Sequence, residues 1–175
     1  MPRQRIVYSF RTRLPVSREV AFRWATDFDP GDLGRMGIEA HRKVEWLTDA
    51  LVLLTDSFDA DPFSRRRGVR TVKTKLVHLY PSRWYWTSTH VGGPARYSQF
   101  LYQLEPGGRN WCTLHFSGAQ VESVPRKPTA AALARRAREL RREDSLGWRH
   151  LRRALSREVG PKRRPRGRRR ARRAR

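Results

Sequence analysis

The sequence contains a single cysteine, Cys112, in 175 residues. One cysteine cannot form an intrachain disulfide, so the small secreted scaffolds that depend on disulfides are excluded. Long apolar runs are also missing, because the longest aliphatic run is Ala50–Leu54. That is far shorter than the roughly 20 residues of a membrane-spanning helix. The first residues, MPRQRIVYSF, lack the apolar core of a signal peptide, and we therefore expect a soluble cytoplasmic protein.

Recognisable catalytic and cofactor motifs are missing as well. The sequence has no CxxC, HExxH, Walker A or GxSxG pattern. Asp27, Asp29 and Asp32 have a loose calcium-loop spacing, but Ile38 stands where the bidentate glutamate belongs. We therefore expect neither a metal site nor a cofactor.

Acidic residues are scarce, and the shortage is strongest at the C-terminal end. The chain has 39 Lys and Arg against 16 Asp and Glu, a formal net charge of +23. Residues 160–175 contain many arginines, no acidic residue and no apolar residue beyond Ala and Pro, so we expect a disordered basic tail after a domain over residues 1–159. The tail is either a solubilising terminus or a non-specific contact for nucleic acid or an anionic membrane. The candidate polyanion-binding residues are Arg163, Arg164, Arg168, Arg169 and Arg170.

A long helical pattern runs from Thr129 to Val159. Thr129 is a suitable N-cap, and Gly160-Pro161 is a helix stop. Apolar residues recur between them at steps of three, four and seven, which places them on one stripe, while the opposite face is basic. A helix of this length spans roughly 46 Å, so its stripe needs a large partner. The stripe consists of Leu133, Ala137, Leu140, Gly147, Trp148, Leu151, Leu155 and Val159.

The rest of the chain is rich in strand patterns. A first strand over Ile6–Leu14 precedes two short helical segments, one capped by Ser17 and one over Asp32–Met36, and Asp59–Gly68 is a polar loop. Short connections between the later strands imply antiparallel neighbours, and the twist of strands curls such a sheet. We therefore expect an α+β domain in which a curved antiparallel sheet of about seven strands grips the long helix. The six later strands are expected at Ile38–Thr48, Leu51–Phe58, Val69–Tyr80, Arg83–Val91, Ala95–Glu105 and Trp111–Val121.

This order of elements resembles the START-like, helix-grip superfamily of polyketide cyclases and dehydrases, lipid-transfer START domains and pollen-allergen-like carriers. The opening segment FRTRLPVSREVAFRWATDFDPGDLGRMG is similar to the usual start of the family, and LGWRHLRRAL is similar to its final helix. The resemblance covers roughly residues 5–159. It implies a cavity between sheet and helix for an apolar or amphipathic ligand, whereas the chemistry varies within such a fold.

Candidate site residues lie on the helix stripe and on the strands. Asp144 falls within the stripe, so its carboxylate is expected to point at the sheet as a ligand anchor or a general acid/base; the alternative is a salt bridge at the rim. Trp84, Trp86 and His90 share one predicted strand face, which burial preferences place inward. His90 is alternatively an ordinary hydrogen-bonded histidine. The ligand-binding candidates are Trp84, Trp86, His90, Tyr102, Phe116, Asp144 and Trp148.

Three functions follow from these patterns. The preferred one is binding or transport of a hydrophobic or amphipathic small molecule, lipid- or polyketide-like, in the cavity between sheet and helix. The second is a cofactor-free cyclase or dehydratase acting on a polyketide-like substrate, with Asp144, His90 and Tyr102 as acid/base candidates. The third is a polyanion adaptor that binds through the basic helix face and the tail. The sequence indicates neither the ligand nor the oligomeric state.

Overall fold

The computed structural model describes residues 2–58 and 70–159, so the predicted polar loop and the predicted basic tail lie outside the described residues. Seven strands form one antiparallel sheet in the order β1-β7-β6-β5-β4-β3-β2. The strands are β1 (Arg3–Leu14), β2 (His41–Thr48), β3 (Leu51–Phe58), β4 (Thr71–Tyr80), β5 (Tyr85–Gly92), β6 (Gln99–Gly108) and β7 (Trp111–Ser123). The helices are α1 (Arg18–Ala25), α2 (Asp32–Arg35) and α3 (Ala130–Glu158).

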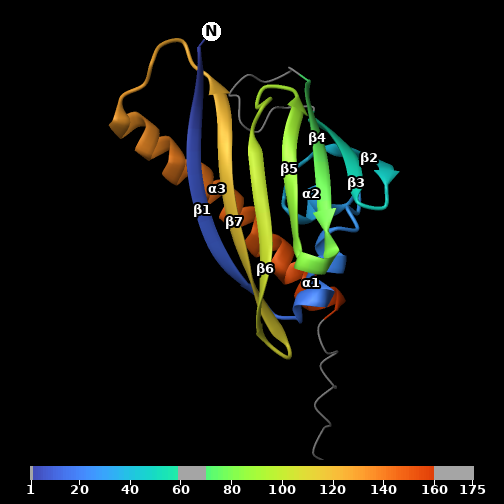
Figure 1. The fold of residues 1–175 in the computed structure, drawn as a ribbon. Helices are drawn as coiled ribbons and strands as arrows, with labels where there is room; N and C mark the ends of the chain where they lie inside the picture. Colours follow the sequence, from blue (N-terminus) through green and yellow to red (C-terminus); the bar gives the residue numbers. More distant parts are fainter. Residues whose placement is uncertain (1, 59–69, 160–175) are drawn as a thin grey trace, which may run out of the picture.

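The sheet curves around α3, which crosses its concave face diagonally (Figure 1). The two short helices α1 and α2 follow β1; α1 lies near one end of the sheet, whereas α2 lies behind β4 and β5 in the view of Figure 1. The predicted α+β architecture is therefore confirmed, including the single curved sheet and the long C-terminal helix.

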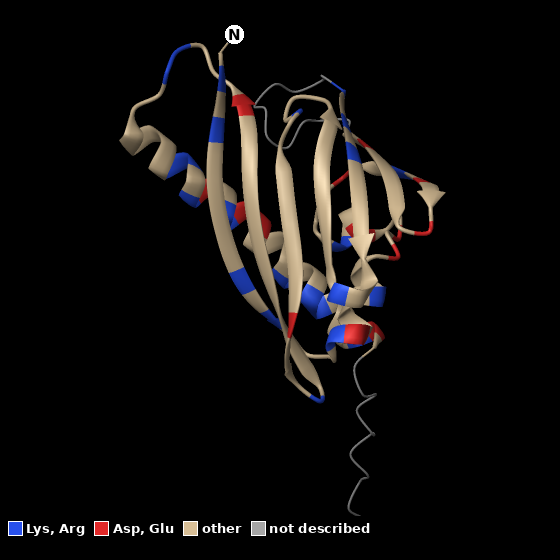
Figure 2. Cartoon of the chain, viewed as in Figure 1, with Lys and Arg blue, Asp and Glu red and all other residues tan. Residues whose placement is uncertain are grey.

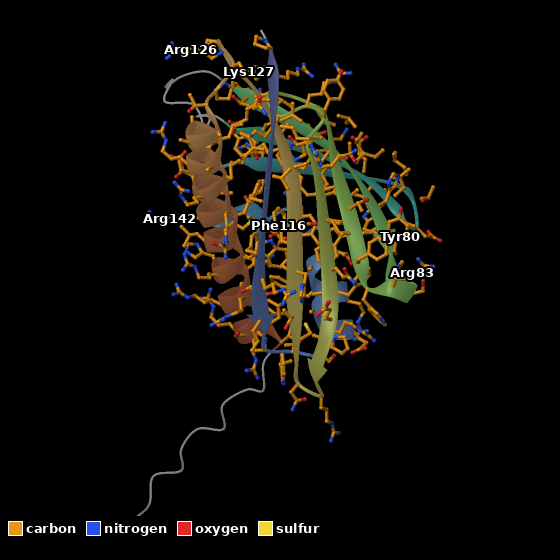
Figure 3. The ribbon with its side chains drawn as sticks, turned by 60° about the vertical axis from the view of Figure 1, so that its left-hand side comes forward. Tyr80, Arg83, Phe116, Arg126, Lys127 and Arg142 are labelled. Carbon is orange, nitrogen blue, oxygen red and sulfur yellow. The ribbon has the colours of Figure 1, made fainter. Side chains whose placement is uncertain are left out.

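Helix α3 has the predicted ends, and its buried stripe agrees with the prediction except at Val159, which is the C-cap and is exposed. The Thr129 hydroxyl accepts a hydrogen bond from the amide of Ala132 at 3.2 Å, and Val159 is the C-cap after 29 helical residues. Figure 3 shows Arg142 on the side of α3 that faces away from the sheet. The helix is thus amphipathic, and the sheet is the partner that covers its apolar side. Its buried residues are Leu140, Gly147, Trp148, Leu151, Ala154 and Leu155.

Strand alternation places one face of each central strand in the core. On β7 the buried residues Cys112, Leu114, Phe116 and Gly118 face inward. Gly118 lies directly beneath an aromatic ring, because a Cβ added there would be 2.6 Å from Cδ1 of Phe100. The glycine therefore lets the Phe100 ring lie close to the sheet.

Strand β5 begins later than the sequence pattern indicates. Pro81 opens a single 3-10 turn over Pro81–Arg83, and Trp84 follows it in a left-handed conformation with φ of 56°. Trp84 therefore lies outside the strand that holds Trp86, contrary to the prediction. Its indole packs against Phe22, which Trp86 also contacts, and beneath the guanidinium of Arg18. Strand β6 likewise begins at Gln99 rather than Ala95.

Candidate functional site

A cavity of about 760 Å³, partly open to solvent, lies between the concave face of the sheet and α1, α2 and α3. Its volume falls within the roughly 300–1,000 Å³ of small-molecule sites. Helix α3 packs mainly against β1, and the cavity extends over the inner faces of β2 to β6, where α1 and α2 also line it. The cavity has an aromatic region and a charged region, which are described in turn.

The aromatic wall of the cavity consists of Trp86, Phe100, Tyr102 and Trp148. The rings of Trp86 and Tyr102 stack in parallel, with centroids 5.0 Å apart. Trp148 projects from α3 and approaches both rings, at 6.3 Å from Trp86 and 6.0 Å from Tyr102. Sheet and helix therefore meet through three aromatic rings that present apolar surface to the cavity.

A buried ion-pair network lies on the inward faces of β2, β3 and β4. Arg42 donates from Nε and Nη2 to the two carboxylate oxygens of Asp56, at 2.7 and 3.1 Å. Lys75 donates from Nζ to Oδ2 of Asp56 at 2.5 Å, and Asp56 is fully buried. Burial opposes ionisation of Asp56, but Lys75 and Arg42 outweigh it and lower the pKa of this carboxyl to about 2.

His90 and Lys73 lie beside this network and also line the cavity. Both side chains are buried, and the His90 ring lies 5.1 Å from the ring of Phe100. Burial, together with the charges of Lys75 and Lys73, lowers the pKa of His90 to about 3, so the imidazole is neutral at pH 7. Its Nδ1 atom is buried without a hydrogen-bond partner. We call Arg42, Asp56, Lys73, Lys75 and His90 the polar end of the cavity.

Asp144 projects from α3 toward the sheet, where the hydroxyl of Tyr8 on β1 donates to its Oδ2 at 2.6 Å. Burial raises the pKa of the Asp144 carboxyl, and the bond from Tyr8 partly opposes that effect. Burial also raises the pKa of Tyr8, and the nearby Asp144 adds to the rise. The pair is therefore a hydrogen-bonded phenol and carboxyl in which the phenol keeps its proton. Asp144 is the member of the pair that lines the cavity.

A second group of charges lies where α3 meets the end of β7. Arg136 on α3 donates from Nη2 to Glu122 at 2.8 Å and also approaches Glu139 and Glu143 at 3.3 and 3.4 Å. These four side chains line the cavity as well. These ion pairs connect the N-terminal half of α3 to the sheet. In that half the apolar residues of the stripe before Leu140 are only partly buried.

Five of the seven predicted ligand-binding residues line this one cavity: Trp86, His90, Tyr102, Asp144 and Trp148. Trp84 and Phe116 are placed elsewhere. Trp84 lies against α1, and Phe116 stacks on Phe10 at 4.6 Å behind the aromatic wall. The five predicted polyanion-binding arginines are outside the described residues.

Sequence reasoning missed the ion-pair network and Tyr8. The sequence signal for the network was the alternation of the strands. Asp56 lies on the same face of β3 as Val52, Leu54 and Phe58, all of which are buried. On β4, Lys75 lies on the same face as the buried residues Lys73, Val77 and Leu79. Strand alternation applied to the charged residues, and not only to the apolar ones, identifies these inward charges.

Neither a metal cluster nor a membrane-spanning helix is present in the part of the chain that the structure describes. Within residues 2–58 and 70–159, no three His, Cys, Asp or Glu side chains come together as a metal site requires. In the same ranges no helix is long and apolar enough to cross a membrane. Figure 2 shows the lysine, arginine, aspartate and glutamate residues distributed along α3, at the start of β1 and around β2 and β3.

No protein-family model and no curated protein matches the chain, but solved structures match its fold. The Zhui aromatase/cyclase from Streptomyces has a TM-score of 0.70 at 11% identity, with 89% of this chain and 96% of that chain covered. A START superfamily protein from Mycobacterium smegmatis has a TM-score of 0.60 at 13% identity, with coverages of 88% and 97%. Norcoclaurine synthase from Thalictrum flavum, in complex with dopamine and hydroxybenzaldehyde, has a TM-score of 0.59 at 13% identity and coverages of 89% and 89%. The chain therefore has the START-like, helix-grip fold, and at such identities the likeness shows the fold alone.

Proposed function

We propose that this protein binds a hydrophobic or amphipathic small molecule in the cavity between the sheet and α3. The cavity itself is the observation that carries the proposal, because about 760 Å³ of space is bounded by an aromatic wall on one part and by polar and charged side chains on others. A core that served stability alone would be filled by side chains, since protein interiors are close-packed. The structural neighbours include an aromatase/cyclase and a synthase with two small aromatic molecules bound, which supports a small-molecule role.

A cavity-filling substitution tests this function. Ser88 on β5 is buried and lines the cavity, whereas Thr87 points to the opposite face of the same strand. We expect Ser88→Trp to weaken binding of the uncharged fluorescent probe N-phenyl-naphthylamine at least about tenfold, which is about 1.4 kcal/mol. The measurement is a fluorescence titration, with urea denaturation to confirm that the variant is folded.

Thr87→Trp is the matched control, since it adds the same side chain next to Ser88 but on the outer face. Its affinity for the probe should equal that of the wild type. A wild-type protein that binds neither this probe nor any co-purifying apolar molecule in native mass spectrometry would contradict the proposed function, as would equal affinities for all three proteins.

A second candidate function is a cofactor-free cyclase or dehydratase. The observation that favours it is the Tyr8–Asp144 pair at 2.6 Å, because burial raises the pKa of the Asp144 carboxyl and so favours the protonated form that a general acid requires. Tyr102 and the neutral His90 line the same cavity and can donate hydrogen bonds to a substrate carbonyl. General acid–base catalysis of an enolisation or a loss of water uses groups of these types and contributes typically 10²–10⁴-fold.

Dehydration of an added aryl β-hydroxyketone tests this alternative. The products are the enone and one water, detected by mass spectrometry, and Asp144→Asn should lower the rate by about 10²–10⁴-fold. Asp144→Asn should leave binding of N-phenyl-naphthylamine within a few fold of the wild type, which separates catalysis from binding. A wild-type rate equal to that in buffer, or an unchanged rate in the variant, argues against Asp144 as the acid/base.

The third alternative, contact with nucleic acid or an anionic membrane, stays a prediction. Arginines recur on the exposed side of α3, among them Arg138, Arg141, Arg142 and Arg149. Such a surface attracts polyanions in a salt-dependent manner, and the predicted tail would extend it.

A further inference from the structure

Strand β1 has arginines on its outer face and no acidic residue. Strand alternation turns Tyr8 and Phe10 into the core and leaves the arginines on the opposite face, where they are exposed. They are Arg3, Arg5, Arg11 and Arg13, and none of them forms an ion pair with a described residue.

Helix α3 separates its charges onto two flanks. Six exposed arginines lie within about 120° of the helix circumference and along about 22 Å of its length, at 3.6 residues per turn and 1.5 Å per residue. Glu139 and Glu143 lie on the other flank, where both approach Arg136 and line the cavity. The six arginines are Arg138, Arg141, Arg142, Arg149, Arg152 and Arg153, and none of them forms an ion pair with a described residue.

A groove joins the arginines of β1 to those of α3. Arg11 of β1, His115 of β7 and Arg141 of α3 line it, together with the hydroxyl residue Ser9. In the sheet register Arg11 lies opposite His115. Among the described residues no acidic side chain lines the groove, although Oε2 of Glu105 lies 2.7 Å from Nε2 of His115. The two sets of arginines therefore form one continuous surface, which we call the arginine surface.

The acidic residues of these elements do not balance this charge. Together β1, β7 and α3 contain 13 arginines and five acidic residues. Asp144 faces Tyr8, Glu158 pairs with Arg35, and the other three carboxylates converge on Arg136. No acidic residue of β1, β7 or α3 therefore pairs with an arginine of the arginine surface.

The composition of the arginine surface favours one kind of polyanion. A helix bound at a membrane surface turns its apolar face to the lipid, but the apolar stripe of α3 is buried against the sheet, and Val7 and Leu146 are the exposed large apolar side chains of β1 and α3. Single-stranded nucleic acid stacks its bases on aromatic side chains, but Tyr8, Phe10 and Trp148 are all buried. What these two elements expose is arginine, which suits phosphate contacts along a duplex.

We propose that the arginine surface binds the sugar–phosphate backbone of double-stranded nucleic acid, with α3 along the phosphates of one strand and Arg11 and Arg141 around a phosphate in the groove. Guanidinium groups match phosphate oxygens bidentately. Backbone contacts do not read bases, so no sequence preference is expected. The assignment develops the third alternative above and does not depend on the cavity, since none of these arginines lines it.

The salt dependence of duplex binding tests the proposal. Fluorescence anisotropy of a labelled duplex of about 20 base pairs, offered as DNA and as RNA of the same mixed sequence, gives the association constant of the full chain between about 50 and 200 mM NaCl. Each phosphate contact with DNA contributes about −0.9 to the slope of log K against log salt concentration. Arg142→Gln with Arg149→Gln should make that slope less steep by about 1.8 and weaken binding at least about tenfold at about 100 mM NaCl. Arg11→Gln with Arg141→Gln should have the same effect.

Lys43→Gln with Arg83→Gln is the matched control, because it also removes two exposed positive charges. Lys43 lies on β2, at the sheet edge opposite β1, and Figure 3 shows Arg83 on the other side of the molecule from Arg142. Its slope should equal that of the wild type. Residues 160–175 are kept in every protein, so any contribution from them is common to all. Every variant should keep the wild-type affinity for N-phenyl-naphthylamine and the wild-type urea denaturation.

The surface and its partner are overturned by different results. A wild type that binds neither duplex, unchanged slopes in both surface variants, or an equal loss in the control would each overturn the arginine surface as the binding site. Tighter binding of the single strand than of the duplex would overturn the duplex assignment. Vesicles of phosphatidylcholine and phosphatidylserine at about 4:1 are the last comparison. If the surface variants lose binding to these vesicles but not to the duplexes, the partner is an anionic membrane.

Discussion

Replacement of Asp56 by asparagine is expected to lower the free energy of unfolding by about 3–5 kcal/mol. Asparagine keeps the shape of the side chain but removes the charge that compensates Arg42 and Lys75, whose ion pairs with Asp56 are buried. The loss arises mainly from the uncompensated cations, because desolvated charges without a partner are strongly unfavourable. Urea denaturation at pH 7, followed by circular dichroism, measures this change.

Asp49→Asn is the matched control for this experiment, since Asp49 is exposed in the turn between β2 and β3. Surface substitutions of this kind usually change stability by less than about 0.5 kcal/mol. An effect of Asp56→Asn as small as that of Asp49→Asn would show that the ion pairs add nothing to stability.

The pH dependence of stability provides a second measure of the same network. The folded-state pKa of Asp56 is about 2, below the value of 3.8 for an unperturbed aspartate. Its contribution to stability is therefore fully present above about pH 4 and is lost as the pH falls through about 2, for a total of about 2–3 kcal/mol. The Asp56→Asn variant should lack this component.

Asp144 contributes to the pH dependence with the opposite sign, because burial raises its pKa. Its contribution to stability is present at low pH and is lost as the pH rises through its folded-state pKa.

Trp148→Ala is expected to have an effect of similar size, about 3–5 kcal/mol. Trp148 is 8% exposed and links α3 to the sheet through its contacts with Trp86 and Tyr102. Truncation removes both ring contacts and enlarges the cavity, and the surrounding rings relax only in part. We also expect weaker binding of N-phenyl-naphthylamine, by about 1–3 kcal/mol, because a large apolar contact surface is lost.

Arg149→Ala is the control for Trp148→Ala, since it changes the next residue of the same helix on its exposed side. It should change the free energy of unfolding by less than about 0.5 kcal/mol. If Trp148→Ala proved equally mild, the aromatic contact between helix and sheet would not contribute to the stability of the fold.

The fold was predictable because local signals and the global pattern agree. The cap at Thr129, the stop at Gly160 and the stripe through Leu140, Leu151 and Leu155 define α3 without reference to any other element. Short connections between strong strand patterns then leave an antiparallel meander as the simplest sheet. The strand ends were less well predicted, as at Trp84, because a left-handed residue after a 3-10 turn leaves no signature in hydrophobic alternation.

The aromatic residues and Asp144 of the candidate site could be predicted from the sequence, but the ion-pair network of Arg42, Asp56 and Lys75 could not. Asp144 was identified because a carboxylate interrupts an apolar stripe, which is conspicuous in sequence. Lys73 and Lys75 lie in a segment whose pattern is typical of an ordinary amphipathic strand. They point inward because the sheet buries that face of β4, which the pattern of this one strand does not determine. Tyr8 and Asp144 are 136 residues apart in the chain, and no pairwise pattern in one sequence links positions so distant.

Gly118 has a consequence for ligand selection that the cavity lining does not reveal. Because the Phe100 ring lies over the space where a Cβ would be, any larger residue at position 118 would displace that ring into the cavity from behind. The depth of the cavity therefore depends on position 118, which does not itself line the cavity. On the proposed function, a larger residue at position 118 is therefore expected to favour shorter ligands while every lining residue stays unchanged.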